Sequence, residues 1–73
     1  MNNIEINPRI CNGKPVIAGT RIPVTVILDH FADGNSMENI QEKYPELRKE
    51  QIVDALHYCH DIIDHSEVET VNA

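Results

Sequence analysis

Apolar residues recur at helical spacing through the middle of this chain. A first run has the spacing i, i+3, i+4 and i+7 and consists of Val24, Ile27, Leu28 and Phe31. This spacing places the four side chains on one face of a helix. Pro23 suits the first helical turn, and Gly34 suits the position just past the end. The pattern therefore predicts an amphipathic helix that begins at Pro23 and ends before Gly34.

A second, shorter helix is predicted between Ser36 and Pro45. The Ser36 hydroxyl can cap it by accepting from backbone N–H groups, and Glu38 suits its positive end. Its apolar stripe consists of Met37, Ile40 and Tyr44. Pro45 then stops the helix.

A third helix is predicted to open after Leu47 and to fade near Ser66. Its apolar face holds Ile52, Ala55, Leu56, Cys59, Ile62 and Ile63. Leu47 and Ile52 have the spacing of a hydrophobic staple around a start at Arg48. Arginine is a poor N-cap, so this start lacks the usual side-chain acceptor.

The N-terminal part of the chain lacks the helical period and indicates β structure. Residues 4–6 alternate apolar and polar, and residues 15–17 form a second β-prone run. Asn12-Gly13 and residues 18–20 are expected to reverse the chain. Glycines permit the sharp reversals while prolines restrict φ beside them, so we expect a pinned loop.

These elements predict a mainly α fold, a tri-helical bundle with a helix-turn-helix and short N-terminal strands. The break at residues 44–47 separates the second and third helices. We expect one domain over residues 1–66, with strands and a Gly/Pro loop at 4–22 and helices at 23–66. Residues 67–73 have no periodicity and are expected to fray. A chain of 73 residues buries a limited core, so partners are expected.

The charge divides unevenly along the chain. Residues 1–22 carry Arg9, Lys14 and Arg21 against one acidic residue, whereas residues 23–73 carry three basic and eleven acidic residues; the formal net charge is −6. Non-specific nucleic-acid affinity depends on neutralising phosphates, so any DNA binding would have to be local.

The two cysteines, Cys11 and Cys59, lie far apart in the sequence. No apolar leader or membrane span is expected, so we interpret both as reduced thiols of a cytoplasmic protein, in preference to a disulfide. Cys59 lies on the apolar helical face and should act as a small buried hydrophobe.

Motifs for catalysis or cofactor binding are weak. The Gly13-Lys14 pair resembles part of a phosphate-binding loop, but positions 8 and 15, where that loop needs Gly and Ser or Thr, are both proline. The stretch "HYCHDIIDH" offers His and Asp at i, i+4 spacing that could ligate a metal, although a solvated polar face explains it better. No nucleophile, base and orienting group occur together. We expect neither enzyme activity, nor a resident metal, nor a cofactor.

Residues 4–60 closely resemble the domain-of-unknown-function 433 family of small bacterial and archaeal proteins, which are regarded as antitoxin-like. The shared motifs are residues 13–17, residues 19–24, Gly34 followed by Ser36, Tyr44-Pro45, and Ala55-Leu56. The resemblance implies a homeodomain-like tri-helical fold and association with a PIN-like nuclease toxin encoded next to it. This chain has Arg48 and Lys49 where the family tends to open the last helix with Thr or Ser. Either these charges contact a phosphate or partner, or the change is simple drift.

The expected function is therefore that of an antitoxin-like protein that neutralises a PIN-like ribonuclease by protein contact. The predicted partner-binding residues are Arg9, Lys14, Thr20 and Arg21. A PIN-like nuclease holds magnesium with clustered carboxylates, which a cation could approach. Arg21 could instead pair internally with Glu5 or Asp29. The acidic helices could equally meet a basic toxin surface.

The alternative is a helix-turn-helix transcription regulator, which could control its own operator. Its predicted DNA contacts are Arg48 and Lys49 to the backbone and Gln51 near a base edge. A structural adaptor with neither activity is a third possibility. A homodimer is expected in any case, through the N-terminal strands or an apolar helix face.

Overall fold

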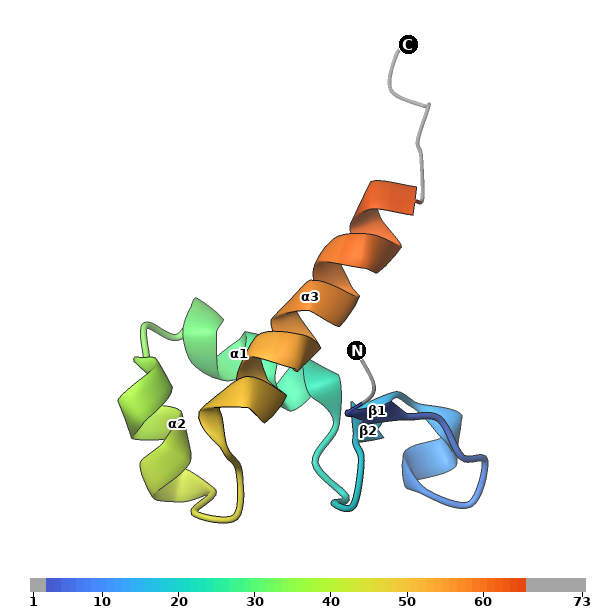
Figure 1. The fold of residues 1–73 in the computed structure, drawn as a ribbon, viewed down its shortest axis with the longest axis horizontal. Helices are drawn as coiled ribbons and strands as arrows, with labels where there is room; N and C mark the ends of the chain where they lie inside the picture. The colour runs from blue at the N-terminus through green and yellow to red at the C-terminus, as the bar shows by residue number, and fades with distance from the viewer. Residues whose placement is uncertain (1–2, 66–73) are drawn as a thin grey trace, which may run out of the picture.

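Three helices and a two-stranded sheet form in the predicted order (Figure 1). The computed structural model describes residues 3–65, so the predicted tail at 67–73 lies outside the described residues. The elements are β1 (Ile4–Glu5), a short 3₁₀ turn η1 (Cys11–Gly13), β2 (Val16–Ile17), α1 (Val24–Ala32), α2 (Met37–Lys43) and α3 (Lys49–His65). The predicted mainly helical fold with short N-terminal strands is confirmed.

The boundaries of α1 and the start of α2 follow from the residues at these positions. Pro23 occupies the N-cap of α1, and Gly34 follows the helix with a φ of +90°, where a side chain would be strained. Ser36 caps α2 as predicted, because its Oγ accepts from the Asn39 backbone N–H at 3.1 Å. Asn39 completes the capping box, since its Oδ1 accepts from the Ser36 backbone N–H at 3.2 Å.

The start of α3 is stabilised without a capping side chain at Arg48. The Oε1 atom of Gln51 reaches back and accepts from the Arg48 backbone N–H at 2.7 Å. Leu47 and Ile52 both lie in the hydrophobic core, as the predicted staple requires. The unfavourable cap at Arg48 is therefore compensated locally.

Replacing Gln51 with alanine should lower the free energy of unfolding by about 1 kcal/mol, because an orphan N–H at the start of α3 loses its acceptor. Gln51→Glu keeps an acceptor at the same position and places negative charge at the helix N-terminus, so it should retain most of the stability. Urea denaturation of both variants measures the difference. Equal losses of unfolding free energy in the two variants would show that the hydrogen bond from the Arg48 N–H to the residue 51 side chain contributes nothing to stability.

The N-terminal sheet is built around β2. Ile4 pairs with Ile17 and Glu5 with Val16 in antiparallel register, and Val16 also bridges to Pro23 on the other side. The turn that joins β2 to Pro23 includes Gly19, which has a φ of +80°. The first strand is one residue shorter than predicted, since Ile6 leaves the ladder and is 59% exposed. β2 is thus paired along both edges.

The predicted turn at Asn12-Gly13 is also confirmed, with φ angles of +59° and +82°. Cys11 adopts a positive φ as well, +51°, which the sequence did not predict. Successive left-handed residues coil the chain tightly here, and the amide of Lys14 donates to the Cys11 carbonyl at 3.1 Å. The coil fixes the backbone on the N-terminal side of Lys14.

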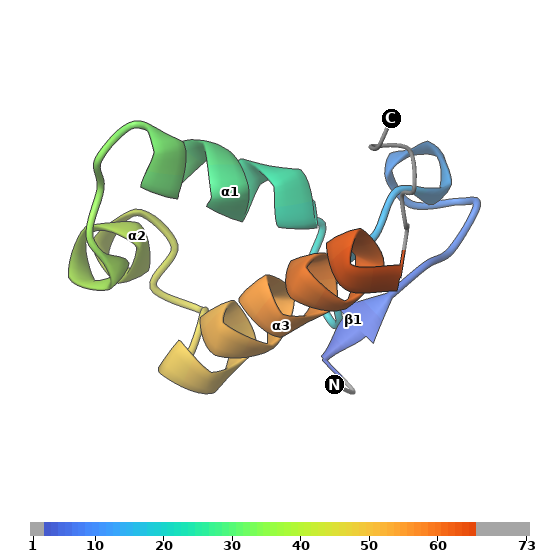
Figure 2. The same ribbon diagram turned by 90° about the horizontal axis from the view of Figure 1, so that it is seen from above.

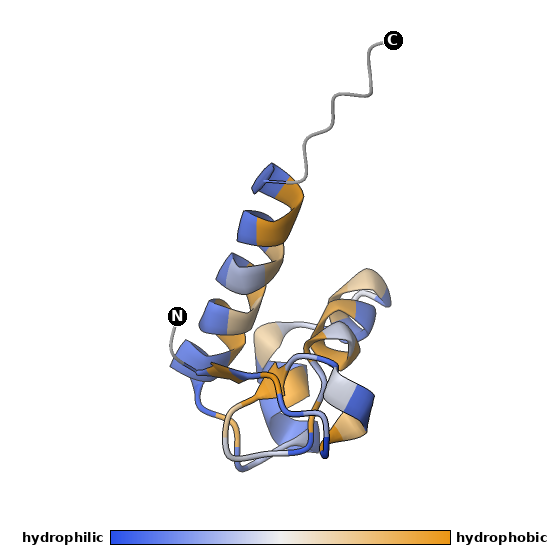
Figure 3. Ribbon diagram, turned by 90° about the vertical axis from the view of Figure 1, so that its right-hand side faces the viewer, coloured by the Kyte–Doolittle hydropathy of each residue, from blue (hydrophilic) through white to orange (hydrophobic). Residues whose placement is uncertain are grey.

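The core takes one fully buried isoleucine from β2 and one from each helix: Ile17, Ile27, Ile40 and Ile52. α3 contacts α1, α2 and β1 and so joins the helices to the sheet (Figure 2). The Asn3 amide donates to Asp54 Oδ2 at 2.7 Å and fixes the chain before β1 to α3. The C-terminal half of α3 extends past the other helices (Figures 1 and 3).

Candidate interaction surfaces

The first candidate surface is the basic segment, defined as residues 9–21. Its three cations, Arg9, Lys14 and Arg21, are all exposed. Its backbone is held along one edge of β2 because the Ile17 amide donates to the Ile22 carbonyl at 3.0 Å and the Val24 amide donates to the Pro15 carbonyl at 2.9 Å. The other edge of β2 pairs with β1. The segment therefore presents its cations from an ordered backbone.

Internal ion pairs do not occupy these cations in the part of the chain that the structure describes. The salt bridges found within residues 3–65 are Arg48 with Glu50 and His60 with Asp61. Arg21 shares a shallow depression of about 450 Å³ with Glu5 and Glu46, yet forms a salt bridge with neither. The alternative pairing with Asp29 is not formed either. The guanidinium is left accessible to an external carboxylate.

Thr20, which the sequence places in the turn at residues 18–20 and among the partner-binding residues, has its hydroxyl bonded within that turn. Its hydroxyl donates to the Ile17 carbonyl at 2.6 Å and accepts from the Ile22 backbone N–H at 3.0 Å. Both bonds lie inside the turn that follows β2, so the side chain stabilises the basic segment from within. These bonds stabilise the turn that carries Arg21, and the contact of Thr20 with a partner stays a prediction.

Replacing Thr20 with valine removes both hydrogen bonds while nearly preserving side-chain shape. We expect the free energy of unfolding to fall by about 1–2 kcal/mol, since the Ile22 amide loses its acceptor. Thr20→Ser retains the hydroxyl and should lose much less. Thermal and urea denaturation of the pair test this, and a serine variant as unstable as the valine variant would contradict it.

The predicted DNA-contacting residues separate into two groups. Arg48 and Lys49 are exposed at the start of α3, where Arg48 Nε lies 3.8 Å from Glu50 Oε1. Gln51 is only 8% exposed, and its Oε1 is bound to the Arg48 N–H. This placement is unfavourable for reading a base edge, because the acceptor is already used within the helix cap.

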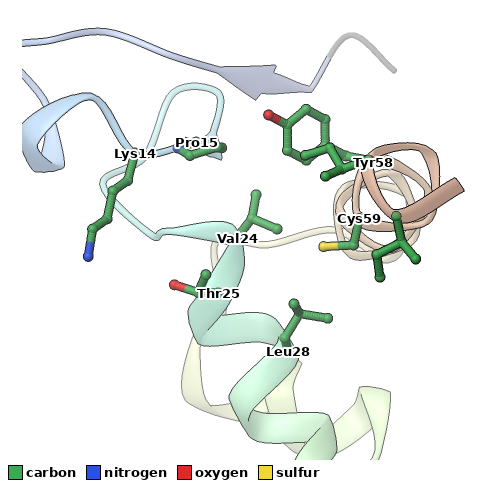
Figure 4. Close-up of a pocket in the computed structure, with 9 residues that line it drawn as sticks. Lys14, Pro15, Val24, Thr25, Leu28, Tyr58 and Cys59 are labelled. Atoms are coloured by element: carbon green, nitrogen blue, oxygen red, sulfur yellow. The ribbon is translucent and has the colours of Figure 1, made fainter. Parts of the chain in front are cut away.

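A second surface, which sequence reasoning missed, is an apolar groove of about 400 Å³ between α1 and α3 (Figure 4). The α1–α3 groove is lined by Lys14, Pro15, Val24, Thr25, Leu28, Tyr58, Cys59, Ile62 and Ile63. In Figure 4, the side chains of Val24, Leu28 and Cys59 point into the space between the helices, whereas the ammonium group of Lys14 points away from it. The side chains that face the groove are therefore apolar.

Three large apolar side chains of this groove are exposed to solvent: Leu28 at 38%, Ile62 at 50% and Ile63 at 73%. The sequence placed them on apolar helical faces together with core residues. The available signal was the length of the α3 stripe, which runs well past the residues that α1 and α2 cover.

Both cysteine thiols are free, as predicted. Burial raises the pKa of the Cys59 thiol, so it remains protonated at neutral pH and packs against the core as an apolar group. The Cys11 Sγ donates to the Arg21 carbonyl at 3.5 Å, which connects the η1 turn to the far end of the basic segment.

The His and Asp side chains near the end of α3 are exposed. His60 Nδ1 lies 3.4 Å from Asp61 Oδ1, and His65 Nδ1 lies 2.7 Å from the Asp61 carbonyl. Within residues 3–65, no three His, Cys, Asp or Glu side chains gather closely enough to hold a metal ion. Over the same residues, no helix combines the length and apolar character needed to cross a membrane.

Comparisons with known proteins agree with this fold. The chain resembles the crystal structure of a DUF433 member protein from Anabaena variabilis, with a TM-score of 0.82 and 31% identity over 88% of this chain and 63% of that one. It is also 41% identical over 49 residues to the uncharacterized protein y4eO of Sinorhizobium fredii (strain NBRC 101917 / NGR234), which covers 67% of this chain but only 22% of that protein. This chain thus spans less than two thirds of either relative. Residues 4–59 match the family described as "Protein of unknown function (DUF433)", and the chain belongs to that family.

Proposed function

We propose that this chain is an antitoxin-like cytoplasmic protein that neutralises a PIN-like ribonuclease by protein contact. The observation that carries the proposal is Arg21, whose exposed guanidinium lies on the turn after β2 and forms no salt bridge among residues 3–65. A nuclease that binds magnesium through clustered carboxylates offers the planar, bidentate acceptor that a guanidinium matches.

The rigidity of the basic segment favours such a contact. Binding a flexible loop costs conformational entropy, which reduces affinity. Here the turn is already held by backbone bonds around β2 and by the Thr20 hydroxyl. Arg9 and Lys14 lie in the same segment and add positive charge that steers an acidic surface towards it.

Co-expression with the product of the adjacent gene, followed by size-exclusion chromatography and an RNase assay, tests the proposal. We expect a stable complex and loss of RNase activity. Separate elution together with undiminished RNase activity at micromolar protein would contradict it.

A second candidate function is DNA binding by α2, the following turn and α3. The exposed Arg48 and Lys49 at the start of α3 favour it, whereas the buried Gln51 and the carboxylates of α3 disfavour it. It predicts a gel shift of the protein's own promoter without any toxin, and one that weakens steeply as salt is raised. Such a shift would favour this function over toxin binding.

A further inference from the structure

The apolar stripe of α3 continues beyond the core. Ile52 and Ala55 are fully buried, whereas Ile62, about two to three turns further along the same face, is half exposed. Figure 3 shows apolar residues along one side of α3 up to its end, with polar residues on the other side. An exposed apolar stripe next to a groove is the pattern of an interaction surface.

One chain supplies both halves of a helix-in-groove contact. The groove lies between α1 and the C-terminal half of α3, and that same half of α3 carries apolar side chains at i, i+3 and i+4, namely Cys59, Ile62 and Ile63. Helices that bind apolar grooves use this spacing. We infer that the α1–α3 groove receives the C-terminal half of α3 from a second copy of this chain, in a two-fold symmetric dimer.

The charge distribution on α3 permits two copies to approach, although each carries a net charge of −6. Successive helical residues are separated by about 100°, so Asp61 lies about 200° around the axis from Cys59. Asp54 also lies away from the stripe, where it binds Asn3. The residues that line the groove include no carboxylate, and Lys14 is their one charged member. Pairing the stripes thus buries apolar surface and leaves the carboxylates in solvent.

The surface available for this contact is small. Stable interfaces bury about 800 Å² on each partner, which is more than a few half-exposed side chains and a small groove provide. Small interfaces are typical of weak, transient complexes, so we expect a dimer that dissociates reversibly on dilution. The N-terminal strands offer a poorer surface, because each is two residues long and β2 is already paired on both edges.

Sedimentation velocity over a range of protein concentrations tests the inference, with Ile62→Glu as the disrupting variant. The matched control is Ile6→Glu, which introduces the same charge at a similarly exposed isoleucine (59% against 50%) beside β1. Leu28→Glu, on the α1 wall, is a second disrupting variant should the first unfold. Circular dichroism at low concentration verifies that each variant is folded.

We expect wild type and Ile6→Glu to dimerise alike, and Ile62→Glu and Leu28→Glu to weaken association by about tenfold or more. Wild type that stays monomeric at all concentrations would overturn the inference. Dimerisation that survives both groove substitutions, or that is abolished by Ile6→Glu alone, would also overturn it. Arg21→Ala should leave self-association unchanged, so this outcome is separate from that of toxin binding.

Discussion

Replacing Ile52 with alanine is expected to lower the free energy of unfolding by about 3 kcal/mol. Ile52 is fully buried, lies in the core with Ile17, Ile27 and Ile40, and belongs to the staple at the start of α3. Its truncation removes apolar burial and leaves a cavity where three helices and the sheet meet. A chain of this length is stabilised by roughly 4–11 kcal/mol, so the loss is a large fraction of the total.

Urea denaturation at low protein concentration measures this change, and Ile62→Ala is its matched control. Both substitutions delete the same atoms from the same helix and bring the same gain in helix propensity, but Ile62 is half exposed. The control should lose less than about 1 kcal/mol. Equal losses for the two variants would mean that the core is not centred on Ile52.

Arg21→Ala is expected to weaken inhibition of the partner ribonuclease by about tenfold or more while leaving the melting temperature nearly unchanged. The physical reason is that Arg21 is exposed and forms no salt bridge within residues 3–65, so its removal breaks no ion pair of the fold described there. Arg21→Lys keeps the charge but loses the planar fork, and it should fall between wild type and alanine. Titration of RNase activity and a thermal melt give the two readouts.

Arg48→Ala is the matched control for Arg21→Ala. It removes an exposed arginine whose ion pair with Glu50 is also exposed and worth little. Inhibition should be unaffected, because Arg48 lies outside the basic segment. A fall in melting temperature for Arg21→Ala with full inhibition retained would instead make Arg21 a structural residue.

The helices could be predicted closely because their signals are local. Helical spacing, Pro23, Ser36 and Gly34 act within a few residues, and so does the staple of Leu47 with Ile52. The sequence did not predict that the side chains of Asn39 and Gln51 accept hydrogen bonds from the backbone N–H groups at the starts of α2 and α3. A capping box is recognised by Ser or Thr followed three residues later by Glu or Gln. Asn39 departs from the second position of that pattern, and Arg48, before Gln51, departs from the first.

The α1–α3 groove was missed for a different reason. Periodicity shows which face of a helix is apolar, but not whether a neighbouring helix is long enough to cover it. α1 has 9 residues and α3 has 17, which correspond to about 14 Å and about 25 Å of helix. The last turns of α3 therefore extend beyond the part of the helix that α1 covers.

The basic segment was recognised from its cations, but the sequence left two questions about it open. Whether Arg21 pairs with Glu5 or Asp29 depends on distances across the fold, which no local pattern contains. The role of Thr20 is local, because a threonine that follows a glycine turn often bonds to the turn's own backbone. The Thr20 hydroxyl bonds in this way to the Ile17 carbonyl and the Ile22 amide.

Because β2 is paired along both edges, the basic segment unfolds together with the core as one cooperative unit. Ile17 is fully buried and its amide is bonded to Ile22, so this stretch can open only if the core opens with it. A protein that grips the segment would therefore raise the melting temperature of the whole domain in proportion to the logarithm of its concentration. Amide exchange at Ile17 would slow to the same extent, which turns one buried N–H into a reporter of occupancy.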